Sequence, residues 1–375
     1  MSARIGLFGR ASSVLAAILA TALAASLAGC AAEPPSSAAP SGDAPAAVDP
    51  AAPVEEAEDA SSFRGSLSEE GENAVNEGSE TSDVLFPEEL LSIPASYSEP
   101  CAEEGRVERL DYDTFEAFSY DSQSQPLSKN AMVYVPYGYD GSRPYNVVYL
   151  MHGGWSDQTT YLGTPEAPSE FKRQIDHAVA DGIIEPCLIV CPTYNNLDND
   201  DAADYALALE LTARYPNELV NDLMPAVESA YRTYADAPTP DSFAASRDHR
   251  AFVGFSMGSV TTWHIFESCM AYFRYFAPSS GNAGSGAYWA DAVRRQGFGA
   301  EDFMVIGATG AEDFNGSAFT ALMQDMAADP MFTLGDGEPG TNLIFRIGEG
   351  ESHNGYAANR YVYNALAFLW KGSAA

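Results

Sequence analysis

The stretch of this sequence best suited to chemistry is 254–258, which reads Gly-Phe-Ser-Met-Gly. It matches G-x-S-x-G, the pattern of a serine held on a sharp turn between a strand and a helix. An apolar, β-branched run precedes it and a helical pattern follows it, as that turn requires. The turn raises the serine hydroxyl above the sheet, where it can attack a carbonyl carbon and form an acyl-enzyme. Ser256 is therefore predicted to be a nucleophile.

An acyl-transfer serine needs a base, a group that orients the base, and N–H donors for the oxyanion. Where this turn occurs, the acid follows the serine along the chain and the histidine comes last. The loop after the apolar run 303–308 contains Glu312 and Asp313, and we predict Asp313 to be the acid, with Glu312 as the alternate. The Gly-rich loop 348–355 contains His353, which we predict to be the base.

The other histidines lie in less suitable places. His249 precedes the strand that leads to Ser256, so it belongs at the opposite edge of the sheet. His177 and His264 fall within predicted helices, where a packed or solvated histidine is the ordinary outcome. His152 lies in a glycine-containing loop and is expected to shape that loop.

Two backbone donors are expected for the oxyanion. The N–H of Met257 lies at the start of a predicted helix, where the helix dipole also favours negative charge. The second donor is expected from the loop after the apolar run 145–151, which offers Gly154 or Trp155.

A substrate cleft is expected above the serine. Trp155, Tyr194 and Asn282 each follow the carboxyl end of a predicted strand, so we predict that they wall this cleft. Aromatic walls with a few amide and hydroxyl groups suit a planar acyl group or a sugar ring better than a long alkyl chain.

The elements that must position these residues alternate between strand and helix. Runs typical of strands occur at 106–112, 131–136, 145–151, 187–192, 251–255, 272–277, 303–308 and 343–347. Helices are predicted at 171–180, 219–234, after Gly258, near 317–326 and at 356–370, with Pro225 expected to kink or restart the second. This alternation predicts an α/β fold: a mostly parallel sheet with helices on both faces and the site beyond the carboxyl ends of the strands.

The first hundred residues have a different composition. Arg4 and Arg10 precede an Ala/Leu-rich run that ends Leu-Ala-Gly-Cys30, which predicts a lipoprotein signal peptide over 1–29 and lipid attachment to Cys30. The alternative is an ordinary signal peptide. Residues 30–100 are rich in Ala, Pro, Ser and acids and predict a disordered tether. Residues 101–375 are then the folded domain of an exported, cell-surface protein, which touches the membrane only through its lipid.

Charge and cysteine content restrict the partners. The formal net charge is −34, of which about −21 falls on residues 101–375, so nucleic acid is excluded and a neutral substrate is expected. Cys101, Cys187, Cys191 and Cys269 have no metal-ligand spacing, and their pairing cannot be assigned. The acidic run 198–204 lacks the spacing of a calcium loop and is expected to be a solvated loop.

Taken together, four motifs resemble the esterase D-type α/β hydrolases, and most of all the feruloyl and acetyl-xylan esterases of carbohydrate esterase family 1. They are HRAFVGFSMG at 249–258, LMHGG at 150–154, the loop 309–313, and the Ser-His pair of 352–353 with YVYNAL at 361–366. The resemblance covers about residues 104–371. Two departures are Trp155, where the family often has a further glycine, and Ser259, which replaces the usual second glycine after the methionine.

The resemblance implies an α/β-hydrolase fold and a serine carboxylesterase that removes feruloyl or acetyl groups, with plant polysaccharide as the expected substrate. Carried over by position, it assigns Ser256 as nucleophile, Asp313 as acid and His353 as base. The oxyanion hole would be Met257 with the Gly154–Trp155 loop. Neither a cofactor nor a metal is implied. The alternatives are an acyltransferase of the mycolyltransferase type and a catalytically inactive binding module of the same fold.

Overall fold

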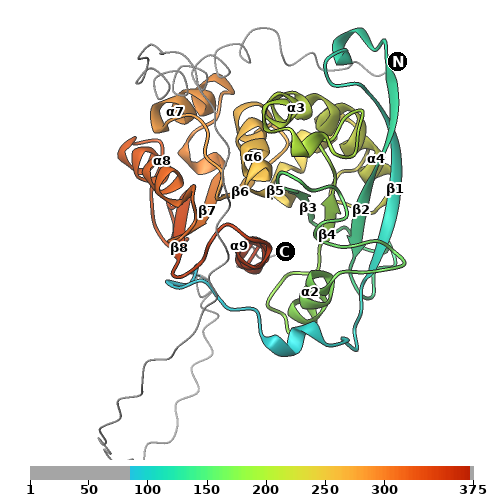
Figure 1. Cartoon of the computed structure of the whole chain (residues 1–375), viewed down its shortest axis with the longest axis horizontal. Helices are drawn as coiled ribbons and strands as arrows, with labels where there is room; N and C mark the ends of the chain where they lie inside the picture. The colour runs from blue at the N-terminus through green and yellow to red at the C-terminus, as the bar shows by residue number, and fades with distance from the viewer. Residues whose placement is uncertain (1–84, 372–375) are drawn as a thin grey trace, which may run out of the picture. The chain divides into compact units, whose positions relative to one another are not determined.

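The computed structural model describes residues 85–371 (Figure 1). The predicted signal peptide, Cys30 and the tether up to residue 84 lie outside the described residues. Within 85–371, no helix is both long and apolar enough to cross a bilayer.

An eight-stranded sheet forms the centre of the described part, with the order β1-β2-β4-β3-β5-β6-β7-β8. The strands β1 and β2 pair antiparallel, as do β2 and β4, and every other neighbouring pair is parallel. The strands are β1 (Arg106–Phe115), β2 (Pro126–Val135), β3 (Val147–Met151), β4 (Leu188–Cys191), β5 (Arg250–Phe255), β6 (Tyr275–Ser279), β7 (Met304–Gly310) and β8 (Leu343–Gly348).

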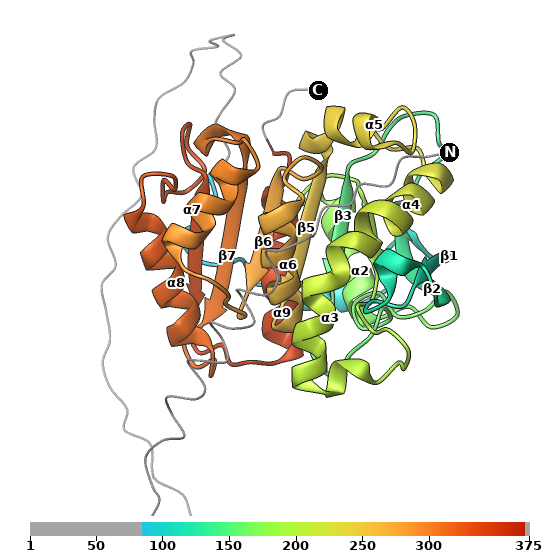
Figure 2. The ribbon, with the colours of Figure 1, turned by 90° about the horizontal axis from the view of Figure 1, so that it is seen from above.

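Helices cover both faces of the sheet (Figure 2). One face carries α3 (Tyr205–Glu218), α4 (Met224–Ala230), α6 (Met257–Ser268), α7 (Gly286–Arg295) and α8 (Gly316–Ala328). The other face carries α2 (Glu170–Ala180) and α9 (Gly355–Phe368). A short helix, α5 (Pro240–Ala245), leads into β5. The predicted fold class is confirmed, whereas α3, α5 and α7 were not predicted from the sequence.

The alternation of side chains along the central strands divides the core into two layers. In β3, Tyr149 and Met151 pack on the α3 and α6 side, while Val148 and Leu150 pack on the α2 and α9 side. All four side chains are fully buried. A strand buried on both faces reads as one continuous apolar run, which is why the sequence located β3 and β5 correctly.

The helix predicted over 219–234 is interrupted. A π-helical turn (Leu219–Leu223) separates α3 from α4, and Pro225 lies in the first turn of α4. Proline lacks an N–H and is best tolerated in the first turn of a helix, so the predicted restart at Pro225 is confirmed. Pro216, by contrast, lies inside α3.

Residues 85–100 belong to the packed domain, in contrast to the prediction that the tether extends to residue 100. Phe86, Leu90 and Tyr97 are buried in the α2 and α9 layer. Arg346 of β8 donates to the Pro87 carbonyl at 2.6 Å, and Asn364 of α9 exchanges hydrogen bonds with the backbone of the same segment. Full burial of each large apolar side chain contributes about 1.5–3 kcal/mol. The segment has no periodic pattern, so composition alone did not separate it from the tether.

Candidate active site

Ser256 occupies a strained turn between β5 and α6. Its backbone has φ 58° and ψ −119°, a conformation that side-chain-bearing residues rarely adopt. A Cβ at Gly254 would lie 2.2 Å from the Gly258 carbonyl oxygen, and one at Gly258 would lie 2.3 Å from the Met151 carbonyl oxygen. Both ends of the motif must therefore be glycine, as the sequence pattern indicates.

The structure brings Ser256, His353 and Asp313 into one chain of hydrogen bonds. His353 Nε2 lies 2.9 Å from Ser256 Oγ, and His353 Nδ1 lies 2.8 and 3.0 Å from the two carboxylate oxygens of Asp313. Asp313 is 6% exposed. Since a carboxylate only accepts, Nδ1 carries the hydrogen, and Nε2 is left to accept from the serine hydroxyl.

Two neighbouring loops hold the acid and the base together. The N–H groups of Ala311 and Glu312 donate to the carbonyls of Gly348 and Glu351, so the loop after β7 is bonded to the loop after β8. The Glu312 side chain is exposed, whereas that of Asp313 turns inward to His353. Of the two acids considered from the sequence, the geometry selects Asp313.

His353 is packed between two aromatic rings. Phe255 lies 4.5 Å from it and Phe314 lies 4.2 Å from it, measured between ring centroids. Phe314 is nevertheless 81% exposed, so one side of its ring faces solvent beside the histidine. Sequence reasoning missed Phe314. The available signal was its position, because it directly follows Asp313 at the carboxyl edge of the sheet.

The glycine loop after β3 lies against the serine. A Cβ at Gly153 would lie 3.3 Å from Ser256 Cβ. The Gly153 carbonyl accepts from His152 Nδ1–H at 2.7 Å and from the Tyr194 hydroxyl at 2.9 Å. A trans peptide is planar, so fixing this carbonyl directs the Gly154 N–H to the opposite side.

The two candidate loop donors differ in their partners. The Trp155 N–H donates to the Ala202 carbonyl at 3.0 Å, so it is not available to an oxyanion in this conformation. The prediction that Trp155 can serve as a donor is therefore corrected, and Gly154 remains the candidate loop donor. The reason is a contact between two loops that are nearly fifty residues apart, which no local pattern encodes. Met257 starts α6, as predicted.

His152 shapes the loop, as expected, and its tautomer is fixed. Because the Gly153 oxygen only accepts, Nδ1 carries the hydrogen and Nε2 accepts from the Thr193 hydroxyl at 2.7 Å. Burial lowers the pKa of His152 from 6.5 to about 4. The unfolded chain therefore binds this proton more readily, and His152 reduces stability as pH falls from about 6.5 towards 4.

The residues predicted to wall the cleft divide into exposed and buried ones. Asn282 is exposed, and Trp155 is 75% exposed with φ 53°, a backbone region that favours glycine. Tyr194 is only 2% exposed, with its ring stacked on His152. It supports the glycine loop from beneath, so its prediction as a wall residue is wrong.

A pocket of about 270 Å³ opens beside Trp155, between the loops that follow β3 and β4. It is lined by Trp155, Ser156, Asp157, Thr160, Asn199, Asp200, Ala202 and Ala203. Two residues span at most about 7 Å of chain, so Trp155 lies close to the Gly153 contact with Ser256. The sequence identified Trp155 but not the carboxylates and amide around it.

The acidic loop 198–204 uses its carboxylates to hold its own turn. Asp201 accepts from the N–H groups of Asn196, Leu197 and Asp198 at 2.9–3.1 Å. Asp204 caps α3. Among residues 85–371, no cluster of three or more His, Cys, Asp or Glu could hold a metal. Cys101, Cys187, Cys191 and Cys269 are buried and unbridged in the same range.

Comparison with known proteins also indicates an esterase. Residues 122–296 match the family model described as "Putative esterase". The chain is 32% identical over 289 residues to endo-1,4-beta-xylanase Y of Acetivibrio thermocellus, a match that covers 74% of this chain but 24% of that protein. The chain thus spans about a quarter of the length of this curated relative.

Solved structures agree in fold. The feruloyl esterase module from Clostridium thermocellum, solved with sinapinate, is 31% identical with a TM-score of 0.65, covering 75% of this chain and 94% of its own. A ferulic acid esterase of family CE1 from the anaerobic fungus Anaeromyces mucronatus is 15% identical with a TM-score of 0.52, covering 75% and 97%, and shares the fold.

Proposed function

Because this chain belongs to the esterase family that includes the feruloyl esterases of carbohydrate esterase family 1, and is a carboxylic ester hydrolase, we propose that it removes feruloyl or acetyl groups from plant polysaccharide. The proposed route is a Ser256–His353–Asp313 triad and an acyl-enzyme. The observation that supports this most directly is the continuous chain of hydrogen bonds at 2.9 and 2.8 Å. Measuring hydrolysis of methyl ferulate, feruloylated arabinoxylan and acetylated xylan by the purified protein tests the proposal.

The geometry suggests a role for each group in the reaction. Neutral His353 takes the proton of Ser256 as the hydroxyl attacks the ester carbonyl, and Asp313 stabilises the imidazolium that forms. The N–H groups of Met257 and Gly154 stabilise the oxyanion. His353 then protonates the departing alcohol, and a water activated by the same histidine releases the acid. Apart from that water, these steps use only side chains and backbone of this chain.

The surroundings of Ser256 suggest where the alcohol and the acyl group of the ester would lie. His353 must protonate the alcohol oxygen, so the alcohol leaves on the side where Phe314 is exposed. The glycine loop contacts Ser256 through Gly153 and leads to the pocket at Trp155. We assign that pocket to the acyl group, because an aromatic wall with polar groups at its rim suits a phenolic ring.

Trp155→Ala is expected to lower kcat/KM on methyl ferulate by about tenfold while changing the rate on an acetyl ester by less than about twofold. The acetyl group lacks the ring that would contact the indole, and apolar contacts of this kind discriminate by roughly 1–3 kcal/mol. Steady-state kinetics on both esters checks this. Leu197→Ala is the matched control, since Leu197 is 61% exposed and does not line the pocket. A rate that climbs steadily with alkyl chain length would instead favour lipid-like acyl groups.

The alternatives separate by experiment. Family membership and the Ser–His–Asp contacts support an enzyme rather than an inactive binding module. An acyltransferase of the mycolyltransferase type would share the same machinery. Adding a sugar acceptor and comparing transesterification with hydrolysis distinguishes it from a hydrolase.

We also propose that the protein is exported and anchored at the cell surface by lipid on Cys30. The support is the Leu-Ala-Gly-Cys30 sequence after an apolar run. Cys30→Ser is expected to move the protein from the membrane to the soluble fraction without changing its specific activity, because the Ala-, Pro-, Ser- and acid-rich sequence that follows Cys30 predicts a tether that transmits no strain. Fractionation of expressing cells measures this. Continued membrane association of the variant would indicate an uncleaved signal acting as the anchor.

A further inference from the structure

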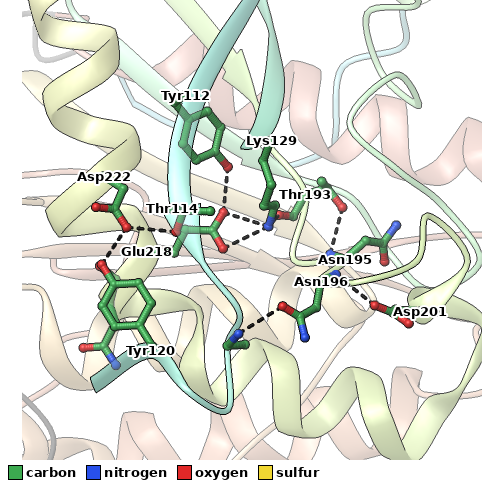
Figure 3. A network of polar contacts seen from close by, with 12 residues as sticks. Tyr112, Thr114, Tyr120, Lys129, Thr193, Asn195, Asn196, Asp201, Glu218 and Asp222 are labelled. Atoms are coloured by element: carbon green, nitrogen blue, oxygen red, sulfur yellow. Dashed lines mark hydrogen bonds and ion pairs between the residues drawn. The ribbon is translucent and has the colours of Figure 1, made fainter. Parts of the chain in front are cut away.

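A buried ion pair lies beneath the loops of the site. Lys129 of β2 and Glu218 at the end of α3 meet at 2.7 Å, with side chains 7% and 9% exposed. Figure 3 shows the ammonium of Lys129 pointing between the Glu218 carboxylate and Thr193. The Tyr112 hydroxyl also donates to Glu218, at 2.6 Å, which helps to fix the carboxylate in place. The triad does not use this pair.

The pair is connected to the glycine loop by consecutive hydrogen bonds. Lys129 Nζ donates to the Thr193 carbonyl at 2.8 Å. The Thr193 hydroxyl accepts from the Asn195 N–H at 2.9 Å and so keeps its own hydrogen for His152 Nε2, 2.7 Å away. His152 Nδ1–H in turn holds the Gly153 carbonyl.

We propose that the Lys129–Glu218 pair is a positioning element for the oxyanion hole. The pair fixes the backbone at Thr193, and the Thr193 hydroxyl then fixes the ring of His152. The His152 ring in turn sets the orientation of the Gly153–Gly154 peptide and so the direction of the Gly154 N–H. The inference rests on the proposed function, since it assigns a purpose to the oxyanion loop of that same site. Lys129 and Glu218 touch no substrate, and they act only through Thr193 and His152.

An oxyanion donor stabilises the transition state more than the bound substrate. Misdirecting the Gly154 N–H should therefore lower kcat and leave KM nearly unchanged. It should weaken a tetrahedral boronic acid adduct of Ser256 by the same factor, because the boronate oxygen occupies the oxyanion hole. A loss of stability alone would alter neither quantity per folded active site.

The first test is the double variant Lys129→Met/Glu218→Gln. Replacing both partners avoids leaving one buried charge unpaired, which is the damaging case. We expect kcat on an aryl acetate to fall by about tenfold, a fraction of the 10²–10³ lost when a donor is removed outright. The inhibition constant of phenylboronic acid should rise by about the same factor, with KM changed by less than about twofold.

The second test, Thr193→Val, interrupts the chain of hydrogen bonds without touching the ion pair. Valine keeps the shape but cannot donate to His152 Nε2, so we expect the same fall in kcat and in boronate affinity. Thr193→Ser keeps the hydroxyl and should restore most of the loss. Thr193→Val therefore tests the proposal even if the double variant fails to fold.

The matched control is Lys172→Met/Asp176→Asn. This pair is also buried and meets at 2.6 Å, but it lies within α2. Replacing it also removes a buried ion pair, yet kcat and boronate affinity per folded molecule should match the wild type. Wild-type kinetics and boronate binding in both Thr193→Val and the Lys129 double variant would overturn the proposal. Absence of any ester hydrolysis by the wild type would instead overturn the proposed function.

Discussion

Replacing Ser256 with alanine should remove nearly all ester hydrolysis and leave the fold intact. Alanine fits the turn but has no hydroxyl to attack the carbonyl carbon, so the acyl-enzyme cannot form. We expect kcat on an aryl acetate to fall by at least about 10⁴-fold, with residual catalysis coming from binding and the oxyanion hole alone. Steady-state kinetics with a matched thermal unfolding curve measures both parts.

Ser259→Ala is the control for this result. Ser259 lies in the first turn of α6, close to Ser256 in the chain, but its hydroxyl donates to the Gly281 carbonyl at 2.6 Å rather than to His353. Its removal should lower the unfolding temperature while kcat stays within a few-fold of wild type. If Ser256→Ala kept even a tenth of wild-type kcat, a barrier change of only about 1.4 kcal/mol, another residue would have to be the nucleophile.

Asp313→Asn should have the second-largest effect, a fall in kcat of about 10³–10⁴-fold. The amide can present its NH₂ group to His353 Nδ1, which favours the tautomer with hydrogen on Nε2. That tautomer cannot accept the proton of Ser256.

Glu312→Gln is the paired variant for this experiment. Glu312 is adjacent to Asp313 but its side chain is exposed, so neutralising it should change kcat by less than about twofold. Comparing the two variants by kcat and by thermal unfolding separates loss of the base from loss of folded protein. The reverse order of effects would make Glu312 the acid.

Much of the site follows from the sequence because its determinants are local. Gly254 and Gly258 must lack a Cβ for the backbone to pass, so the pattern marks the turn wherever it occurs between a strand and a helix. Asp313 and His353 follow the ends of β7 and β8, and the carboxyl ends of parallel strands meet at one edge of the sheet. The order of the three residues along the chain therefore predicted their meeting in space.

Other features depend on contacts between segments far apart in the chain. Tyr194 follows a strand, as a cleft residue would, yet its side chain is buried and its hydroxyl donates to the Gly153 carbonyl. The Trp155 N–H is occupied by Ala202, a partner that lies in another loop. Residue type and spacing indicate that a polar group needs a hydrogen-bond partner, but not which distant residue provides it.

The sequence by itself determined the sheet, the turn that carries Ser256 and the three residues proposed as the triad, because apolar periodicity and the glycine requirement are properties of short stretches. Only the tertiary structure decided that the Trp155 N–H is bonded to Ala202, which leaves Gly154 as the candidate loop donor, that Phe314 packs on His353, and that residues 85–100 belong to the domain. Each of these is set by hydrogen bonds or apolar contacts between loops and termini. These contacts form only after the sheet has brought the loops and the termini together.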